Sequence, residues 1–431
     1  MQVSLENLGK LERKLTVRFP AEQVESRVRQ RVSEMSRNAR IKGFRPGKVP
    51  VKVIEQRFGA QIRNEALSDV VGSTFREAVQ QEKLQPVAMP NIDTDGKPDN
   101  GEIAYTATFE VLPEMPAIDV SNLQIERGTA QVGDADIDAM IETLRAQRRT
   151  FENVDRAAQA GDMVIFEYSA QTGDYRYPET GRERAGTVLG SGALFAAFEE
   201  ILINRSAGDE FEASVAFPVE FRNPQLAGKL VQTGVRIEKV QAPQLPEVDA
   251  KFIQSFGIGE GDVETFRKEV RANLERELDN ALRIRLRNEV AKQLVDAYPE
   301  LDVPQVLIDA EAQRLVRASA PGMPADAPVP PEAIAAAQPA ARRRVAAGLL
   351  LREIGRANDI RPDNKRVSEA VAAIASTYEE PQKVVELYAN DPQMLDGVRT
   401  SVLEDQVAEW VADHATATEK ALSFDEVMHP R

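Results

Sequence analysis

The stretch GFRPGKVP, residues 43–50, places two cations and one aromatic side chain among two glycines and two prolines. Apolar residues at helical spacing predict a helix over about 20–41 before it and a short helix over 51–58 after it. The proline and glycine at its centre favour a tight turn that presents Phe44 beside Arg45. Such a loop suits contacts with RNA phosphates and a shallow apolar surface. A Phe44 ring folded back onto its own domain would explain the spacing equally well.

The cations around this loop stand out in an acidic chain, because the 431 residues carry a formal net charge of -15. Residues 27–63 contain 11 cations and only two acids, Glu34 and Glu55, which gives this window a charge of +9 and leaves -24 for the remainder. A solvated helix face usually mixes both signs to gain ion pairs along the helix. The asymmetry therefore predicts that the window meets a polyanion.

The composition narrows the classes of function. The chain has no cysteine, and its only histidines, His414 and His429, lie close to the C-terminus. This argues against disulfides, against thiolate or histidine metal sites and against an earlier Ser-His-Asp triad, so we expect no metal and no cofactor. We find neither an apolar signal core nor a run of about 20 apolar residues, and we expect a cytoplasmic protein with no membrane partner.

Strand patterns flank the basic window. Residues 14–19 and 103–111 alternate with period two, and apolar residues over 66–79 recur at the spacing of a second helix. We therefore predict an α+β domain over 1–113. A linker with one connecting helix is expected over 114–155.

The pattern changes twice in the remainder of the chain. Short β patterns around a helix over 195–203 predict a small β-rich domain over 156–243. Residues 244–431 are predicted to be helical, with a helix of about 30 residues that begins at Val263 and a last helix that ends near His414. The expected fold class is α+β multidomain, with a β-rich middle domain and an elongated all-helical C-terminal domain that has arms.

The loop and its flanks also carry a resemblance. GFRPGKVP, a basic helix before it and VIEQRFGAQIRNEAL after it resemble the ribosome-docking signature of the bacterial trigger factor family. The segment ARRRVAAGLLLREIGRAND, residues 341–359, resembles the family's C-terminal domain. The resemblance implies that Phe44, Arg45 and Lys48 contact the ribosome, both protein and rRNA, at the exit tunnel. It makes 1–113 the ribosome-binding domain and 244–431 the domain that binds nascent and unfolded polypeptides.

The middle domain resembles the FKBP-type peptidyl-prolyl isomerases in VLGSG, residues 188–192, and in the aromatics that follow. Isomerisation needs no covalent step, because a dry apolar pocket favours the twisted amide and lowers a barrier of about 20 kcal/mol. The resemblance implies a pocket lined by Tyr168, Leu194, Phe195, Phe198 and Phe221. Ala197 stands where the family usually has glycine, and Thr233 where it has an aromatic. A weakened isomerase, a peptide-binding surface and a purely structural core remain alternatives.

Other polar residues look less like a site. We expect Asp162, Glu167, Asp209 and Glu210, which lie around the predicted strands, to face solvent and not to form a catalytic carboxylate pair.

We therefore predict a ribosome-associated, ATP-independent chaperone that binds nascent chains and assists their folding, with prolyl isomerase activity. The first alternative is primarily a prolyl isomerase whose helical arms hold substrates. The second is a non-specific RNA-binding protein, for which binding would depend steeply on salt and would survive replacement of Phe44. A homodimer of the free protein is left open.

Overall fold

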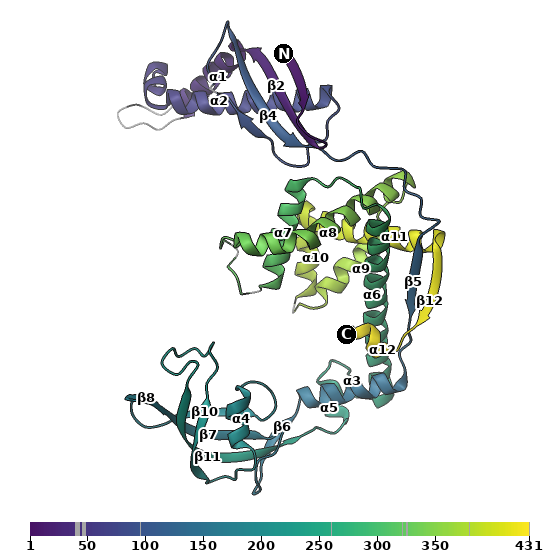
Figure 1. The fold of residues 1–431 in the computed structure, drawn as a ribbon. Coiled ribbons are helices and arrows are strands. Elements are labelled where there is room, and N and C mark those ends of the chain that lie inside the picture. Colours follow the sequence, from purple (N-terminus) through teal and green to yellow (C-terminus); the bar gives the residue numbers. More distant parts are fainter. Residues whose placement is uncertain are drawn as a thin grey trace. The chain divides into compact units, whose positions relative to one another are not determined.

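The computed structural model describes residues 1–38, 44, 49–94, 96–259, 261–320, 322–324, 326–378 and 380–430. They form two compact units, one made of residues 1–129 and 282–421 and the other of residues 130–281 and 422–431 (Figure 1). The division into four domains stays a prediction. Among the described residues, none of the helices combines the length and apolar content needed to span a bilayer.

The N-terminal part is an antiparallel sheet covered on one face by two helices (Figure 1). The strand order is β1-β2-β4-β3, and the bounds are β1 (Gln2–Asn7), β2 (Glu12–Pro20), β3 (Asn91–Asp93) and β4 (Glu102–Glu110). The helices are α1 (Glu22–Asn38) and α2 (Val51–Gln81). Leu15, Val17 and Phe19 alternate along β2 and are buried against Ala66 and its neighbours on α2. The period-two pattern of β2 therefore identifies its core face correctly.

Helix α2 is longer than the sequence predicts. It runs unbroken over Val51–Gln81, 31 residues, where the pattern indicates two shorter helices. Gly59 lies inside it, and an interior glycine weakens a helix by about 1 kcal/mol relative to alanine. Ile54 and Ile62, on either side of Gly59, are both buried in one cluster with Val32 and Val49. We attribute the continuous helix to this shared packing, which outweighs the cost of the glycine.

The middle of the chain forms a six-stranded antiparallel sheet with one short helix. Strand β11 (Leu230–Gln244) is central and pairs with β7 (Met163–Thr172), β10 (Glu210–Ala216) and β6 (Thr150–Asn153). Strand β7 also pairs with β8 (Tyr175–Tyr177) and β9 (Glu183–Val188). Helix α4 (Ala196–Leu202) buries Phe198 and Leu202 in the core of this sheet. The helices α3 (Asp134–Gln147) and α5 (Ala250–Gln254) flank it in sequence.

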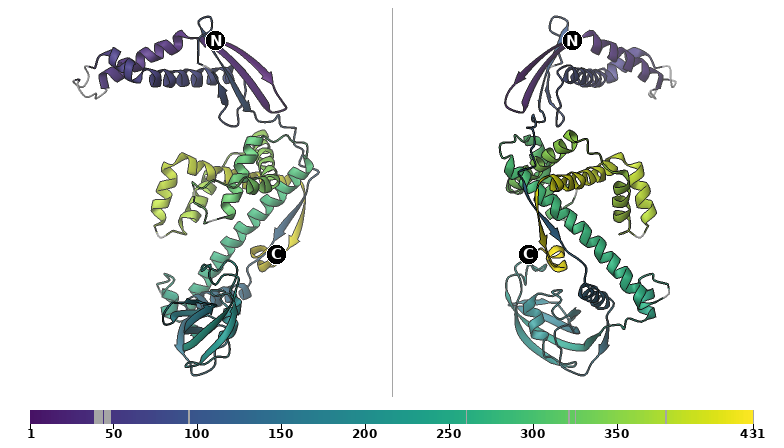
Figure 2. Two further views of the ribbon diagram at one scale, coloured as in Figure 1. Left: turned by 60° about the vertical axis from the view of Figure 1, so that its left-hand side comes forward. Right: turned by 90° about the vertical axis from the view of Figure 1, so that its right-hand side faces the viewer.

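The C-terminal part is mainly helical, as Figure 2 shows in two further views. Its helices are α6 (Val263–Ala297), α7 (Gln305–Ser319), α8 (Pro331–Ala357), α9 (Asn364–Ala375), α10 (Pro381–Asn390), α11 (Pro392–His414) and the short α12 (Phe424–Met428). Val290 of α6, Leu350 of α8 and Val407 of α11 are buried in a common core. The long helix from Val263 and the end of the last long helix at His414 are confirmed.

One strand lies in this helical region. Strand β12 (Thr416–Ala421) pairs in parallel with β5 (Gln124–Thr129), which comes from the segment after the N-terminal sheet. Glu126 of β5 accepts hydrogen bonds from Lys420 of β12 and from Arg285 of α6. Every residue of β12 is exposed, so no apolar periodicity could have revealed it. The α+β multidomain fold class with a helical C-terminal region is confirmed.

Candidate docking and peptide-binding sites

The end of the α1–α2 helix pair has a small core of its own. Val32 of α1 packs with Val49, Ile54 and Ile62, and all four side chains are buried. The hydroxyl of Ser36 donates a hydrogen bond of 2.6 Å to the carbonyl of Val49. This core ties α1 to Val49 and to the first turns of α2.

Phe44 is the residue of the predicted docking set that the structure describes. Its side chain is 39% exposed, and it is not among the residues that pack in the core at the end of the helix pair. Arg45 and Lys48 lie outside the described residues. An exposed aromatic favours contact with a partner over the alternative in which Phe44 folds back onto its own domain.

Ion pairs divide the cations of the basic window into two groups. Arg31 and Arg27 lie 3.1 and 4.0 Å from the carboxylate of Asp69, and Arg63 lies 2.6 Å from that of Glu25. The hydrogen bond that Arg31 donates to Asp69 is the main reason why the pKa of Arg31 is raised. Those three cations are compensated by acids that the sequence window excludes.

The second group of cations is nearer the loop. Within the described part of the chain, no carboxylate lies within ion-pair distance of Arg29, Arg37, Lys52 or Arg57. Arg29 lies within α1, but Arg37 lies in its last turn, and Lys52 and Arg57 lie in the first two turns of α2. The positive charge that remains for a polyanion is therefore concentrated at the loop end of the helix pair.

The middle domain gathers its aromatic side chains into one connected cluster. Phe198 lies between Tyr168 and Phe195, with ring centroids 5.5 and 5.7 Å away, both edge to face. Phe195 and Phe221 lie 5.9 Å apart, and each also packs against Phe217. Edge-to-face contacts of this kind stabilise the relative orientation of the rings. The cluster gives the domain a rigid aromatic surface.

The predicted pocket residues lie together in this cluster. Tyr168, Leu194, Phe195 and Phe221 are partly buried and pack around the buried Phe198. Their assignment as a pocket stays a prediction. The sequence analysis missed Phe217, whose ring centroid is 4.8 Å from that of Phe221. Phe217 directly follows β10, so the alternation of that strand was a signal that could have found it.

The hydroxyl of Tyr168 lies in a poorly solvated place. Burial, and next to it the negative charge of Glu183, raise the pKa of Tyr168 to about 12. The hydroxyl donates a long hydrogen bond of 3.5 Å to the Glu183 carboxylate. The phenol therefore stays protonated over the working range of pH and offers a donor at the edge of the aromatic cluster.

The two departures from the isomerase pattern occupy different environments. Thr233 is completely buried on the core face of β11, and its cross-strand neighbours are Ala170 and Ala213. The resemblance to the isomerases implies a large ring at this position, whereas the structure has a threonine between two alanines there. Ala197 is half-buried on the first turn of α4, next to Phe198.

One of the four acids expected to face solvent does not. Asp162 is 1% exposed, and its carboxylate accepts hydrogen bonds of 2.5 and 2.9 Å from Arg156 and one of 2.9 Å from the Gln159 N–H. Burial raises the pKa of Asp162, but these hydrogen bonds outweigh it and leave the pKa lowered. The expectation was wrong because Asp162 belongs to a buried ion pair that closes the loop before β7. Glu210 is exposed and pairs with Arg182, and Glu167 and Asp209 are half-buried.

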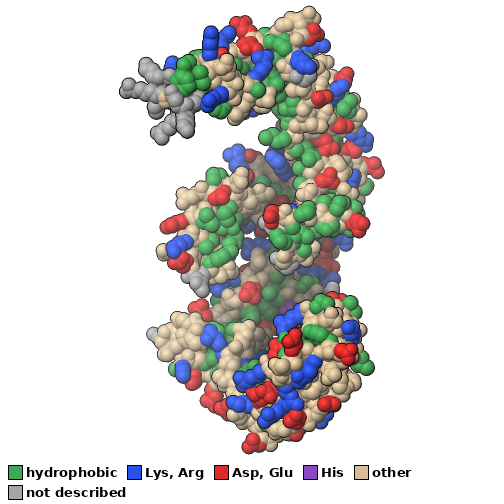
Figure 3. Space-filling view, turned by 90° about the vertical axis from the view of Figure 1, so that its left-hand side faces the viewer, with side chains coloured by type: hydrophobic (Ala, Val, Ile, Leu, Met, Phe, Trp, Pro, Cys, Tyr) green, Lys and Arg blue, Asp and Glu red, His purple; other side chains and the backbone are tan. Residues whose placement is uncertain are grey.

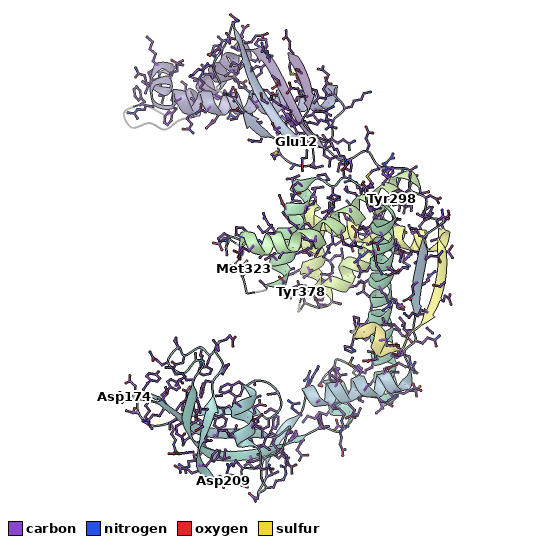
Figure 4. The ribbon with its side chains drawn as sticks, viewed as in Figure 1. Glu12, Asp174, Asp209, Tyr298, Met323 and Tyr378 are labelled. Carbon is purple, nitrogen blue, oxygen red and sulfur yellow. The ribbon has the colours of Figure 1, made fainter. Side chains whose placement is uncertain are left out.

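A third surface lies on the helical hairpins of the C-terminal part. Tyr378, Val385 and Leu387, on or next to α10, are 58%, 42% and 54% exposed, and α10 buries none of its residues. Figure 3 shows apolar side chains on the surface of the helical region, and Figure 4 marks Tyr378 and Met323 at the turns of two hairpins.

Among the described residues, no group of three or more acids or histidines is placed to hold a metal ion.

Three surfaces are therefore candidates for binding a partner. They are the cations near Phe44, the aromatic cluster of the middle sheet and the exposed apolar side chains on and next to α10.

Comparison with known proteins gives the family. A family model of the bacterial trigger factor protein matches residues 1–144, and a model of the trigger factor C-terminus matches residues 262–413. The trigger factor of Xanthomonas campestris pv. campestris (strain B100) is 47% identical over 434 residues, which cover 99% of this chain and 100% of the relative. That of Stenotrophomonas maltophilia (strain K279a) is 46% identical over 432 residues, with the same coverage. The chain belongs to the bacterial trigger factor family and is a ribosome-associated chaperone.

Neither family model covers residues 145–261, which contain most of the middle domain. A solved structure of a trigger factor chaperone covers 96% of this chain and 99% of its own, at 15% identity and a TM-score of 0.45. At that level of similarity it adds nothing to the assignment.

Proposed function

We propose that this chaperone docks on the ribosome through Phe44, Arg45 and Lys48 and works without ATP on nascent chains in the cytoplasm. The observation that supports the docking site is the exposed side chain of Phe44, near Arg37, Lys52 and Arg57 in sequence, three cations that lack acidic partners in the described part. Contacts with both ribosomal protein and rRNA suit this pairing of ring and charge. Association of two copies when free is part of the proposal.

Client binding is assigned to the apolar hairpin surface of α10. Exposed apolar side chains at separate points bind an unfolded chain weakly one at a time and strongly together, because each later contact is intramolecular. The test replaces Tyr378, Val385 and Leu387 with serine. Suppression of aggregation of an unfolded client should fall severalfold, with little change in thermal stability because the side chains are exposed.

A matched control separates this surface from general hydrophobicity. Met89 and Val219 are 94% and 77% exposed elsewhere in the chain. Their replacement with serine should leave the suppression of aggregation unchanged. Equal losses in the two variants would remove the assignment of client binding to α10.

The middle domain is proposed to be a prolyl isomerase of reduced activity. The cluster of Tyr168, Phe195, Phe198 and Phe221 supports the isomerase proposal. We expect the activity to be reduced because the buried Thr233 stands where the isomerases carry an aromatic ring. Loss of about 1.4 kcal/mol of barrier lowering corresponds to a tenfold slower rate.

The second candidate function, primarily an isomerase with substrate-holding helices, is supported by the same cluster of Tyr168, Phe195, Phe198 and Phe221. The two candidate functions can be distinguished by comparing the isomerisation rate on a short prolyl peptide with that on a protein whose refolding is limited by prolyl isomerisation. A chaperone should act much better on the protein than on the peptide, whereas equal rates would favour the enzyme.

A further inference from the structure

A buried carboxylate lies directly behind the aromatic cluster. Glu199 is on the first turn of α4, next to Phe198, and is 8% exposed. One of its oxygens, Oε2, accepts a hydrogen bond of 2.8 Å from the backbone N–H of Gly190. The other, Oε1, is buried and has no hydrogen-bond partner among the described residues.

Gly190 begins the loop that leads to two of the predicted pocket residues, Leu194 and Phe195. Its φ of +85° is a left-handed conformation that favours glycine, and Gly192 at +71° repeats it. The residue before the loop, Leu189, is held firmly, because its N–H donates to the carbonyl of Asp162 and its carbonyl accepts from the N–H of Gly161.

Beyond Gly190, the loop is tied mainly to itself. The N–H of Ser191 donates to the carbonyl of Val188, and that of Ala193 donates to the hydroxyl of Ser191. The hydrogen bond to the Glu199 carboxylate joins the start of the loop to α4. The same helix carries Phe198.

A half-satisfied buried carboxylate is an unfavourable choice for stability alone. An apolar side chain of similar size would avoid the desolvation of a charge and the unpaired oxygen. A charge-assisted hydrogen bond to a backbone N–H is, in return, stronger and more directional than a neutral one. A group that costs stability but fixes a backbone position is characteristic of a site where geometry matters.

We propose that Glu199 is a positioning residue for the peptide-binding surface of the middle domain. Its carboxylate holds Gly190 and so sets where Leu194 and Phe195 stand relative to Phe198. Glu199 itself does not touch the peptide. The inference rests on the proposed isomerase role of this domain.

The test compares Glu199→Ala, Glu199→Gln and Glu200→Gln in the full chain. Glu200 is the adjacent residue on α4 and is exposed, so it controls for loss of charge on this helix. For a prolyl peptide, kcat/KM should fall about tenfold in Glu199→Ala and recover in part in Glu199→Gln, which keeps an oxygen acceptor for Gly190. The loss should lie mainly in KM, because a displaced loop weakens binding. Glu200→Gln should match the wild type.

A second readout follows the loop itself. In Glu199→Gln, the NMR amide signals of Gly190, Leu194 and Phe195 should shift and exchange faster with solvent, while those of β7 and β11 stay unchanged. Unchanged loop signals and unchanged kcat/KM in this variant would overturn the proposal. Identical activity of Glu199→Ala and Glu199→Gln would also overturn it. So would a loss of kcat/KM that is fully explained by the fraction of the variant protein that is unfolded.

The two proposals fail in different ways. A wild-type protein that neither turns over nor binds the prolyl peptide would contradict the isomerase role, and the loop signals would still decide whether Glu199 positions the loop.

Discussion

Tyr168 and Phe198 meet edge to face with their ring centroids 5.5 Å apart, and they differ in what surrounds them. Phe198 is buried in the core of the sheet, whereas Tyr168 is half-buried and directs its hydroxyl to Glu183. One ring therefore belongs to the core of the domain and the other to its partly exposed surface.

Replacement of Phe198 with alanine should destabilise the middle domain by about 3–5 kcal/mol, because it leaves a cavity among Phe166, Tyr168 and Phe195. The slowest-exchanging amides of β7 and β11 report this free energy in the full chain. The same change at the partly exposed Phe221 should cost less than half as much. Similar losses at both positions would contradict the distinction between core and surface rings.

The tyrosine hydroxyl gives a prediction about alkaline pH. The pKa of Tyr168 is raised from 10.0 to about 12 in the folded chain. Its contribution to the free energy of unfolding is therefore fully present below pH 10 and is lost as the pH rises from about 10 to about 12. Wild type and Tyr168→Phe should have parallel stability curves up to pH 10. Above it, the wild type should lose stability faster. Parallel curves up to pH 12 would show that Tyr168 ionises normally.

The buried ion pair gives the opposite dependence on pH. The pKa of Asp162 is lowered below its usual 3.8, so its contribution is present at neutral pH and is lost as the pH falls through the folded value. Asp162→Asn should cost about 1–3 kcal/mol at pH 7, because Arg156 loses its charged partner. The loss of stability caused by Asp162→Asn should be smaller at acid pH.

Asp174, an exposed residue marked in Figure 4, is the matched control for Asp162. Asp174→Asn should change stability by less than about 0.5 kcal/mol at either pH. A cost for Asp162→Asn that is the same at neutral and acid pH would contradict the ion-pair account.

Periodic patterns made much of the fold predictable. Alternation identified the buried face of β2, and the repeat from Val263 identified α6 within a few residues. Where burial comes from another element, the pattern failed: Gly59 does not end α2 because Ile54 and Ile62 pack on α1, and β12 forms by pairing with a strand almost 300 residues earlier. Such long-range pairing leaves no local mark in the sequence.

The site was predictable to a similar degree. Aromatic residues of the middle domain could be named from their motif, and Phe217 could have been found from the alternation of β10, but the buried states of Asp162 and Glu199 could not be predicted. Burial of an acid depends on a partner, and Arg156 and the Gly190 N–H become partners only through the folded loops. The exposure of Phe44 likewise could not be decided from GFRPGKVP, for which both an exposed and a folded-back ring were possible.

The most direct test of the account is cosedimentation with ribosomes. The docking variant replaces Phe44, Arg45 and Lys48 with alanine. Its control replaces Arg76 and Lys83, two exposed cations on and just after α2, with alanine and so removes the same charge. We expect binding to be lost in the docking variant, retained in the control, and suppression of client aggregation to be unchanged in both. Equal pelleting of the docking variant and the wild type would contradict the claim that this loop holds the chaperone on the ribosome.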